Sequence, residues 1–247
     1  MTTWFISDLH LSPARPDITG LFQRFLQEQA VHADALYILG DLFDAWIGDD
    51  DTSDFVAAVQ AALRQLTDSG TPVYFIAGNR DFLIGQRFAQ ITGITLLDEP
   101  SIVDLYGVPT LILHGDTLCT DDVSYQRFRK VIRNRWVQKL LLALPLRLRM
   151  RIANKLRASS KTQQPLSEQQ LKIMDANEHA VREQFIEHDV QRMIHGHTHR
   201  PAIHQHRLPN GEIAERIVLG DWYTQGSFLK VTATEHELIV SPLATDN

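Results

Sequence analysis

Side chains that can bind metal ions follow five short apolar runs of this 247-residue chain. The runs cover residues 4–6, 36–39, 73–76, 111–113 and 193–194, and the side chains that follow them are, in order, Asp8 and His10, Asp41, Asn79, His114, and His195 with His197. Carboxylate, amide and imidazole donors without thiolate are typical of sites for hard to borderline divalent ions. Each motif alone is common in turns, but all five together predict a centre for two metal ions.

The spacing within these motifs has a physical reason. In Asp8-Leu9-His10 two ligands alternate around an apolar residue, so both can turn to one side of an extended segment. The pair His195 and His197 has the same spacing, and Gly196 removes a side chain where the backbone is crowded. Two ions ~3.5–4 Å apart need a shared anion. We predict Asp41 as that bridge, because Gly40 permits close approach.

Strands and helices alternate along the first half of the chain. Each apolar run is short and ends in Gly, Asp, Asn or His, which is typical of buried strands. Between them, Leu21, Phe22, Phe25 and Leu26 share one helical face, and Phe55, Val56, Val59, Leu63 and Leu66 share another. This alternation predicts an α/β fold, in which the carboxyl ends of the strands meet in one crevice. The runs 217–219, 228–231 and 238–240 are predicted to be further strands.

The alternation stops after His114, and residues 123–190 are predicted to be helical, with a break at Pro145 and a loop near 159–167. We interpret them as a cap inserted into a core of residues 1–122 and 191–247. Residues 123–167 contain twelve Lys and Arg and no acidic residue, although the whole chain has a net charge of -6. Such a segment usually contacts an anionic surface. The alternative is a helix face in solvent, which the Leu-rich stretch 140–148 makes less favourable.

The composition restricts the cellular setting. Cys119 is the single cysteine, so no intrachain disulfide can form and a reducing compartment is expected. No basic segment followed by an apolar core begins the chain, and no run of about 18 apolar residues occurs. We therefore predict a cytoplasmic protein without a signal peptide or a membrane span.

The motif order resembles the calcineurin-like metallophosphoesterase superfamily. The resemblance implies a β-sandwich flanked by helices, with Asp8, His10, Asp41 and His197 around one metal ion and Asp41, Asn79, His114 and His195 around the other. Arg80 stands where that superfamily usually has a histidine, which is often assigned as the acid for the leaving group. Arginine keeps its proton, so Arg80 can neutralise phosphate charge but cannot act as an acid. This suits a leaving group that needs no proton, such as phosphate expelled from a diphosphate.

Longer strings are similar to the UDP-2,3-diacylglucosamine diphosphatase family of lipid A biosynthesis. They are 8–11, 40–43, 45–50, 78–82, 114–122, 194–201 and 219–222. The resemblance implies hydrolysis of the diphosphate to UMP and 2,3-diacylglucosamine 1-phosphate, by a metal-activated water that attacks the α-phosphorus, with two Mn²⁺. It also implies peripheral attachment to the cytoplasmic face of the inner membrane. The residues implied to contact substrate are Asn79, Arg80, Asp122, Ser160 and His195, with Asn79 and Arg80 catalytic.

The sequence departs from that family in the loop before residue 173. A family lysine falls near Gln169, and Gln164 stands where other small polar residues contact substrate, so neither joins the predicted site. Lys161 or Lys172 could supply the missing charge.

Other candidates are weaker. His199 could support the metal ligands or order its loop, and the acidic run Asp49–Asp51 could attract metal or lie in solvent. Cys119 is predicted to fill a buried space. The remaining histidines fit no ligand spacing and are predicted to lie on the surface: His32, His179, His188, His204, His206 and His236.

The sequence also allows three other functions. A broader nucleotide-diphosphate or phosphodiester hydrolase would use the same metal ions, but a basic apolar cap argues against a purely soluble substrate. A scaffold without metal should have lost ligands, and none is lost. Nucleic-acid binding is not expected, because the basic segment offers only Phe128 and Trp136 as stacking platforms.

Overall fold

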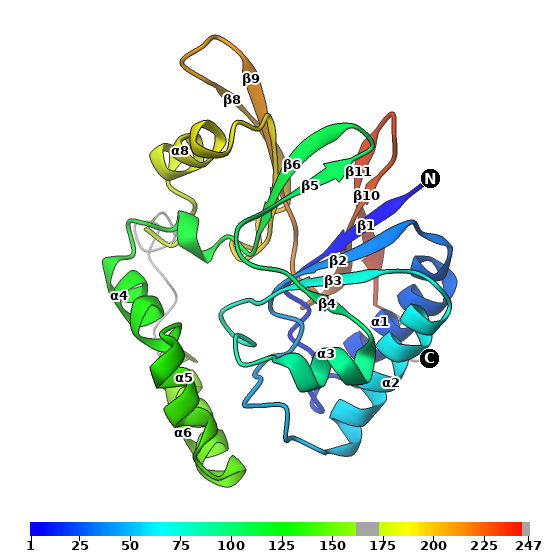
Figure 1. The fold of residues 1–247 in the computed structure, drawn as a ribbon, viewed down its shortest axis with the longest axis vertical. Coiled ribbons are helices and arrows are strands. Elements are labelled where there is room, and N and C mark those ends of the chain that lie inside the picture. The colour runs from blue at the N-terminus through cyan, green and yellow to red at the C-terminus, as the bar shows by residue number, and fades with distance from the viewer. Residues whose placement is uncertain (162–172, 244–247) are drawn as a thin grey trace.

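Two β-sheets form the centre of the molecule in the computed structural model, which describes residues 1–161 and 173–243, and the side chains of all of these except 156–161 (Figure 1). The first sheet has the order β11 (His236–Pro242), β10 (Gln225–Val231), β1 (Thr3–Ile6), β2 (Ala35–Leu39), β3 (Val73–Ile76) and β4 (Thr95–Leu96). The second has the order β5 (Ser101–Leu105), β6 (Val108–Leu113), β7 (Arg192–His195), β9 (Ile213–Val218) and β8 (Ala202–Arg207).

The strands that precede the candidate ligands run parallel. β1 pairs in parallel with β2 and β2 with β3, while β6 pairs in parallel with β7 and β7 with β9. The outer strands β5, β8, β10 and β11 are antiparallel to their neighbours. All five candidate motifs therefore leave their sheets at the carboxyl ends of parallel strands, as predicted.

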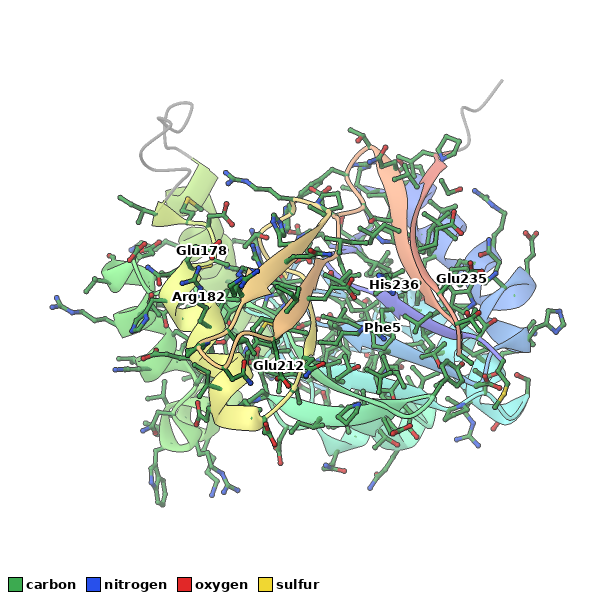
Figure 2. The ribbon with its side chains drawn as sticks, turned by 90° about the horizontal axis from the view of Figure 1, so that it is seen from above. Phe5, Glu178, Arg182, Glu212, Glu235 and His236 are labelled. Carbon is green, nitrogen blue, oxygen red and sulfur yellow. The ribbon has the colours of Figure 1, made fainter. Side chains whose placement is uncertain are left out.

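An apolar layer lies between the two sheets. It contains Phe5 and Leu39 of the first sheet and Ile112, Ile194 and Ile217 of the second, all fully buried. Figure 2 labels Phe5 near the centre of the molecule. The α/β fold with a β-sandwich core, predicted from the sequence, is confirmed.

Helices cover the outer face of the first sheet: α1 (Pro16–Glu28), α2 (Asp54–Asp68) and α3 (Gln86–Thr92). The two predicted helical faces are confirmed, because their members are buried apart from the partly buried Phe55. Two 3₁₀ turns, η1 (Ala30–His32) and η2 (Asp116–Leu118), follow α1 and β6. On the outer face of the second sheet, α8 (Glu178–His188) packs Val181 and Phe185 against β6 and β7.

Strands β5 and β8 were not predicted from the sequence, because neither is a continuous apolar run. Their side chains alternate between exposed and more buried positions, which is typical of strands with one face toward solvent. One prediction about this region was wrong. His206, at the buried end of β8, is 4% exposed rather than on the surface. Its ring pairs with Glu178 of α8 at 3.2 Å and accepts a hydrogen bond from Arg216.

Three helices form an arm beside the core (Figure 1): α4 (Val123–Ile132), α5 (Arg135–Leu142) and α6 (Leu146–Lys161). The Asp122 carboxylate caps α4 by accepting from the amide of Tyr125 at 2.9 Å, and the Asn134 side chain caps α5. Pro145 separates α5 from α6, as predicted. The core ranges 1–122 and 191–247 and the cap range 123–190 stay a proposal.

The basic segment is not one continuous surface. Arg149 is only 5% exposed, and its guanidinium donates to the Ile47 carbonyl and pairs with Asp50. Its Nε donates to the Leu144 carbonyl at 2.9 Å. The expectation that the basic residues of this segment face an anionic partner is therefore wrong for Arg149, which fastens α6 to the loop after β2.

Candidate metal centre

Backbone hydrogen bonds join candidate loops that follow neighbouring strands of the same sheet. The amide of Asp8 donates to the Gly40 carbonyl at 3.1 Å, and the amide of His10 donates to the Asp41 carbonyl at 3.0 Å. The amide of Gly196 donates to the His114 carbonyl at 2.8 Å. The amide of His197 donates to the Asp8 carboxylate and the amide of Arg80 donates to the Asp41 carboxylate, each at 2.8 Å, so the loops of both sheets form one frame.

The backbone of this frame is strained where the ligands lie. Of seven non-glycine residues with positive φ in the described ranges, five belong to it: Asp8, His10, Asp41, His197 and His199. The left-handed region is uncommon for residues with a Cβ. Strain of this kind persists only where the surroundings over-determine it, and it clusters at functional sites.

Glycines allow the loops to approach closely. A Cβ on Gly196 would lie 2.3 Å from an oxygen of Asp8, and one on Gly78 would lie 2.2 Å from an oxygen of Asp41. Gly40 has φ +86°, and a Cβ there would lie 2.5 Å from the His114 ring. The roles predicted for Gly40 and Gly196 agree with these contacts, because any side chain would displace a ligand.

Six of the seven predicted metal ligands lie in direct contact with one another. Ligand atoms of Asp8, Asp41 and His114 lie within 4.8 Å of each other, and those of Asp8, His10 and His199 form a second such group. The Asn79 amide oxygen accepts from His114 Nε2 at 2.9 Å and from His197 Nδ1 at 3.0 Å. The arrangement brings carboxylate, amide and imidazole ligand atoms together, so these residues form a candidate site for metal ions.

His195 lies at the edge of this cluster and belongs to neither group. Its Nδ1 lies 2.8 Å from the Gly196 carbonyl, and its Nε2 lies 3.3 Å from Nη1 of Arg216. A Cβ on Gly115 would lie 2.7 Å from the same Nδ1, so the ring faces the loop that carries His114. Its role as a ligand stays a prediction.

The protonation of the imidazoles suits divalent cations. Burial lowers the pKa of His10 and of His195 to about 3 and that of His197 to about 4, so each is neutral with a lone pair. Both ring nitrogens of His10 are buried without a hydrogen-bond partner in the described chain, as expected for a side chain that awaits an ion.

His114 is the exception. Burial disfavours its charge, but Asp41 and Asp8 outweigh burial and raise its pKa to about 9. Its Nδ1 donates to the Leu39 carbonyl at 2.9 Å, which fixes the ring while Nε2 faces Asn79 and Asp41. Metal-binding histidines commonly donate their other N–H to a carbonyl in this way, so an ion would replace the Nε2 proton.

His199 supports Asp8. Its Nε2 lies 3.2 Å from the Asp8 carboxylate and its Nδ1 3.2 Å from that of Asp221. Burial opposes the charge on His199, but the two hydrogen bonds raise its pKa to about 10. Burial alone would raise the pKa of Asp8, and the His199 bond helps to hold it below its usual value. His199 thus both orders its loop and orients a predicted ligand, two roles that sequence reasoning had left as alternatives.

Asp81 is a supporting residue that sequence reasoning did not single out, although it lies in the string 78–82. It is fully buried. Its carboxylate accepts from the amides of Gly78 and Leu42 at 2.8 Å each, and from the amide of Asp41 at 3.3 Å. The carboxylate therefore ties the loop after β2 to the loop after β3, which carry Asp41 and Asn79.

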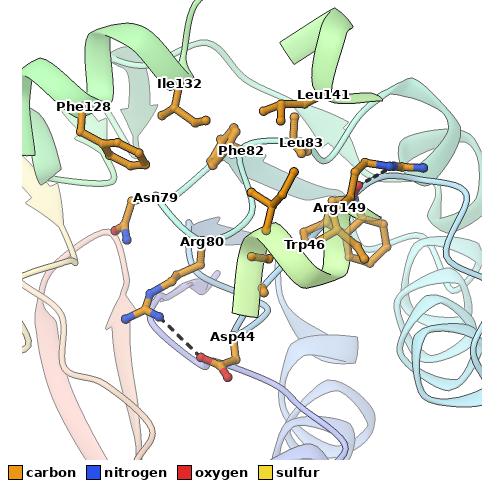
Figure 3. A pocket seen from close by; sticks show the side chains of 14 residues that line it. Asp44, Trp46, Asn79, Arg80, Phe82, Leu83, Phe128, Ile132, Leu141 and Arg149 are labelled. Atoms are coloured by element: carbon orange, nitrogen blue, oxygen red, sulfur yellow. Dashed lines mark hydrogen bonds and ion pairs between the residues drawn. The ribbon is translucent and has the colours of Figure 1, made fainter. Parts of the chain in front are cut away.

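A cavity of 380 Å³ opens between this centre and the cap (Figure 3). Asn79 and Arg80 stand at its polar end, where Arg80 Nη1 lies 3.7 Å from Asp44. Its walls are mostly apolar and come from both core and cap: Trp46, Ile47, Phe82, Leu83, Phe128, Ile132, Leu141, Ile152 and Ala153. A polar group held at the centre would therefore lie beside a space suited to hydrocarbon.

The structure places the predicted substrate residues unevenly. Arg80 is one-third exposed, with Nε 4.0 Å from Asp41. Asp122 is half-buried at the start of α4. Ser160 lies in α6, but its side chain, like Gln164, Gln169, Lys161 and Lys172, lies outside what the structure describes.

Cys119 is buried beside Met174, and burial raises its pKa to about 12, in agreement with a filler role.

Known proteins resemble this chain over most of its length. The family model for calcineurin-like phosphoesterases matches residues 1–201. UDP-2,3-diacylglucosamine hydrolases of Yersinia pestis bv. Antiqua (strain Angola) and Yersinia pseudotuberculosis serotype O:3 (strain YPIII) are each 57% identical over 242 residues, which is 98% of this chain and 100% of theirs. The solved structure of an archaeal phosphodiesterase has a TM-score of 0.48 and 13% identity, over 97% of this chain and 99% of its own.

Asp81→Asn tests the frame of the centre. The amide NH₂ would face backbone N–H groups that now donate to a carboxylate, and hydrogen bonds to charged groups contribute about 1.5–3 kcal/mol. We expect the free energy of unfolding, measured by denaturant titration, to fall by about that amount. The control is Asp104→Asn, an exposed residue that accepts from the amide of Gly107. Equal losses in the two variants would contradict this role for Asp81.

Proposed function

The chain belongs to the calcineurin-like phosphoesterase family, and from this premise we propose that it hydrolyses the diphosphate bond of UDP-2,3-diacylglucosamine. The products would be UMP and 2,3-diacylglucosamine 1-phosphate, in lipid A biosynthesis. The observation that carries the proposal is the position of the apolar cavity, whose polar end is formed by Asn79 and Arg80 beside the candidate metal centre. A diphosphate attached to hydrocarbon chains fits that combination.

The family implies divalent metal ions, and we propose two per chain, with manganese preferred. Asp8, His10, Asp41 and His197 would hold one ion, and Asp41, Asn79, His114 and His195 the other. Two such ions, when bound, supply charge neutralisation and an activated water for phosphoryl transfer. The chain itself fixes the ligands through the strained backbone, the contact of His199 with Asp8, which Asp221 supports from the other side of the ring, and the carboxylate of Asp81.

Arg80 would neutralise charge on the diphosphate. Its guanidinium lies 4.0 Å from Asp41 and 3.7 Å from Asp44, at the polar end of the cavity (Figure 3). Its backbone amide donates to Asp41 at 2.8 Å, so the side chain starts from a fixed point of the centre. Because arginine remains charged, it stabilises a leaving phosphate without transferring a proton. Asn79, Asp122, Ser160 and His195 are the other proposed substrate contacts.

The cap would hold the acyl chains close to the centre. Arg133 of the cap donates to the carbonyls of Ala77 and Gly78 at 3.0 and 2.9 Å, and Arg149 holds α6 to the loop after β2. Between these anchors, Phe128, Ile132 and Leu141 face the cavity (Figure 3). A soluble nucleotide diphosphate would leave this apolar lining without a ligand group, so we favour the lipid substrate over a broader hydrolase activity.

The outer side of the cap would rest on an anionic membrane, at the cytoplasmic face of the inner membrane. Lys139, Arg147 and Arg151 are exposed there, and Trp136 and Leu140 are 74% and 71% exposed. Basic residues beside exposed apolar ones are typical of helices that lie in a membrane interface. Within the described residues, no helix is long and apolar enough to cross a bilayer. The attachment that we propose is peripheral, through these exposed side chains, and we expect no nucleic-acid partner.

Removal of metal should abolish activity. After dialysis against a chelator we expect no hydrolysis of UDP-2,3-diacylglucosamine, and manganese should restore it with saturation at two ions per chain, because two sets of donors share Asp41. His10→Ala should leave one firmly bound ion, counted by elemental analysis. Full activity in the chelated protein, or saturation at one ion, would contradict the two-metal proposal.

Arg80→Ala should lower kcat by about 10²–10³, the usual effect of losing one preorganised donor to a developing negative charge. Its metal content should match that of the wild type. Arg80→Lys should recover part of the rate, because the charge remains without the planar guanidinium. If Arg80→His equalled the wild type on the diphosphate, a proton donor would suffice at this position and the proposed role would be wrong.

Charge reversal on the cap should release the protein from membranes. Each Lys or Arg near an anionic surface contributes about 1 kcal/mol, and the attraction is screened by salt. In the triple variant Lys139→Glu, Arg147→Glu, Arg151→Glu, we expect binding to vesicles of anionic phospholipid to be lost, as measured by sedimentation. The rate of hydrolysis should fall more for the lipid substrate than for a soluble phosphodiester.

The matched control is the triple variant Arg24→Glu, Arg182→Glu, Arg207→Glu, which makes the same change in net charge at exposed positions outside the cap helices α4–α6. It should sediment with vesicles as the wild type does. If vesicle binding does not depend on salt concentration and is equal in the two triple variants, the basic residues of the cap only face solvent.

A further inference from the structure

A second cavity, of 200 Å³, lies on the outer face of the second sheet. His204 of β8 and Arg216 of β9 are paired in register and line it, while the alternate residue Ile217 faces the layer between the sheets. Thr198 and Arg200 of the loop after β7, and Asp175 of the segment before α8, complete its polar lining. Figure 1 shows where these elements meet, at the base of the β8–β9 hairpin.

This cavity reaches the candidate metal centre from a side that the cap helices α4–α6 do not line. Thr198 directly follows His197, and Arg216 Nη1 lies 3.3 Å from the His195 ring. The apolar cavity approaches the same centre from the loops after β2 and β3 and from the cap helices. A diphosphate held at the centre carries a different group on each end. With the acylated sugar in the apolar cavity, the polar cavity remains for the nucleoside.

The polar cavity has hydrogen-bonding capacity that the protein does not use. Arg216 is 5% exposed, and no carboxylate of the described chain lies within 4.0 Å of it. Its contacts are ring nitrogens of His195 and His206, each at 3.3 Å. Some of the five N–H donors of the guanidinium therefore have no partner in the described chain. The Thr198 hydroxyl is likewise buried without a partner in the described chain. Unsatisfied buried polar groups are costly, so such groups suggest a ligand.

We propose that this cavity binds the uracil base of the nucleotide half of the substrate, an inference whose ligand rests on the function proposed above. The pairing edge of uracil presents an acceptor, a donor and an acceptor. Asp175 offers a carboxylate acceptor, and it is paired with the donor Arg200, while Arg216 supplies a second cation across the cavity. Cytosine presents an acceptor where uracil has its N3–H, so it would face the Asp175 carboxylate unfavourably.

The test measures binding of UMP and CMP to the full chain by calorimetry, in the presence of Mg²⁺. Contacts between phosphate and the metal centre are common to both nucleotides, so the difference between their dissociation constants reports recognition of the base. We expect UMP to bind about tenfold more tightly than CMP, the effect of one mismatched buried hydrogen bond. Asp175→Asn should bring that ratio near one, because an amide can donate to N3 of cytosine. The control Asp104→Asn should keep it.

Thr198→Val is a second variant, because its hydroxyl has no partner in the described protein and its loss should leave the unfolding temperature unchanged. It should weaken UMP binding about fivefold to tenfold. If Asp175→Asn did not fold, Thr198→Val alone would decide. The inference would be overturned if Asp175→Asn, like Asp104→Asn, left the ratio of UMP to CMP affinity unchanged. It would also be overturned if Thr198→Val left the affinity for UMP unchanged.

The two proposals fail separately. Wild-type protein that selects UMP through Asp175 but does not hydrolyse UDP-2,3-diacylglucosamine would support the base site and reject the proposed function. Wild-type protein that hydrolyses this substrate, yet binds UMP and CMP equally, would reject the base site and leave the proposed function intact.

Discussion

Two buried carboxylates, Asp8 and Asp41, lie within 4.8 Å of the same imidazole of His114, and most of the surrounding structure serves to hold them there. Buried charges so close repel each other and have lost their water. The chain compensates with backbone donors: the amide of His197 donates to Asp8 and the amide of Arg80 donates to Asp41, each at 2.8 Å. The left-handed ligands and the close glycines follow from the same crowding. Divalent cations would relieve the remaining repulsion, which is why the frame suits them.

The basic segment shows how one feature of composition can have two physical roles. Arg149 and the half-buried Arg133 donate to backbone carbonyls of the core, where they fix the cap. Lys139, Arg147 and Arg151 remain exposed beside large apolar side chains. Charge counting along the sequence cannot separate these groups, because burial of an arginine depends on acceptors that the fold brings from distant loops. Arg133 and Arg149 join the cap to the core, and the exposed cations can face an external surface.

Sequence reasoning succeeded where one local pattern determined the outcome. Strands buried on both faces appear as continuous apolar runs, and ligands at their carboxyl ends follow from parallel pairing. It failed where partners come from far along the chain. The burial of His206 depends on Glu178 and Arg216. For Asp49 the sequence left two alternatives, attraction of metal or a position in solvent, but in the structure its carboxylate caps α3 by accepting from the amide of Phe88. Such residues have ordinary polar identities, and only the tertiary structure selects them.

The root of the cap belongs to the frame of the centre. Arg129 of α4 donates to Asp116 at 2.8 Å and to Glu99 at 2.9 Å, and Glu99 also accepts from the amide of His114 at 2.8 Å. Tyr125 donates to the same buried Asp116 and its ring stacks on His197. Displacement of α4 would therefore leave buried carboxylates unpaired and shift two predicted ligands, which is strongly unfavourable. Helices α5 and α6 make no such contact with the predicted ligands in the described structure. Arg149 of α6 instead bonds to the loop after β2, so the end of the cap that meets phosphate is tied to the ligands themselves, whereas the end that meets hydrocarbon is tied to the loop that follows Asp41.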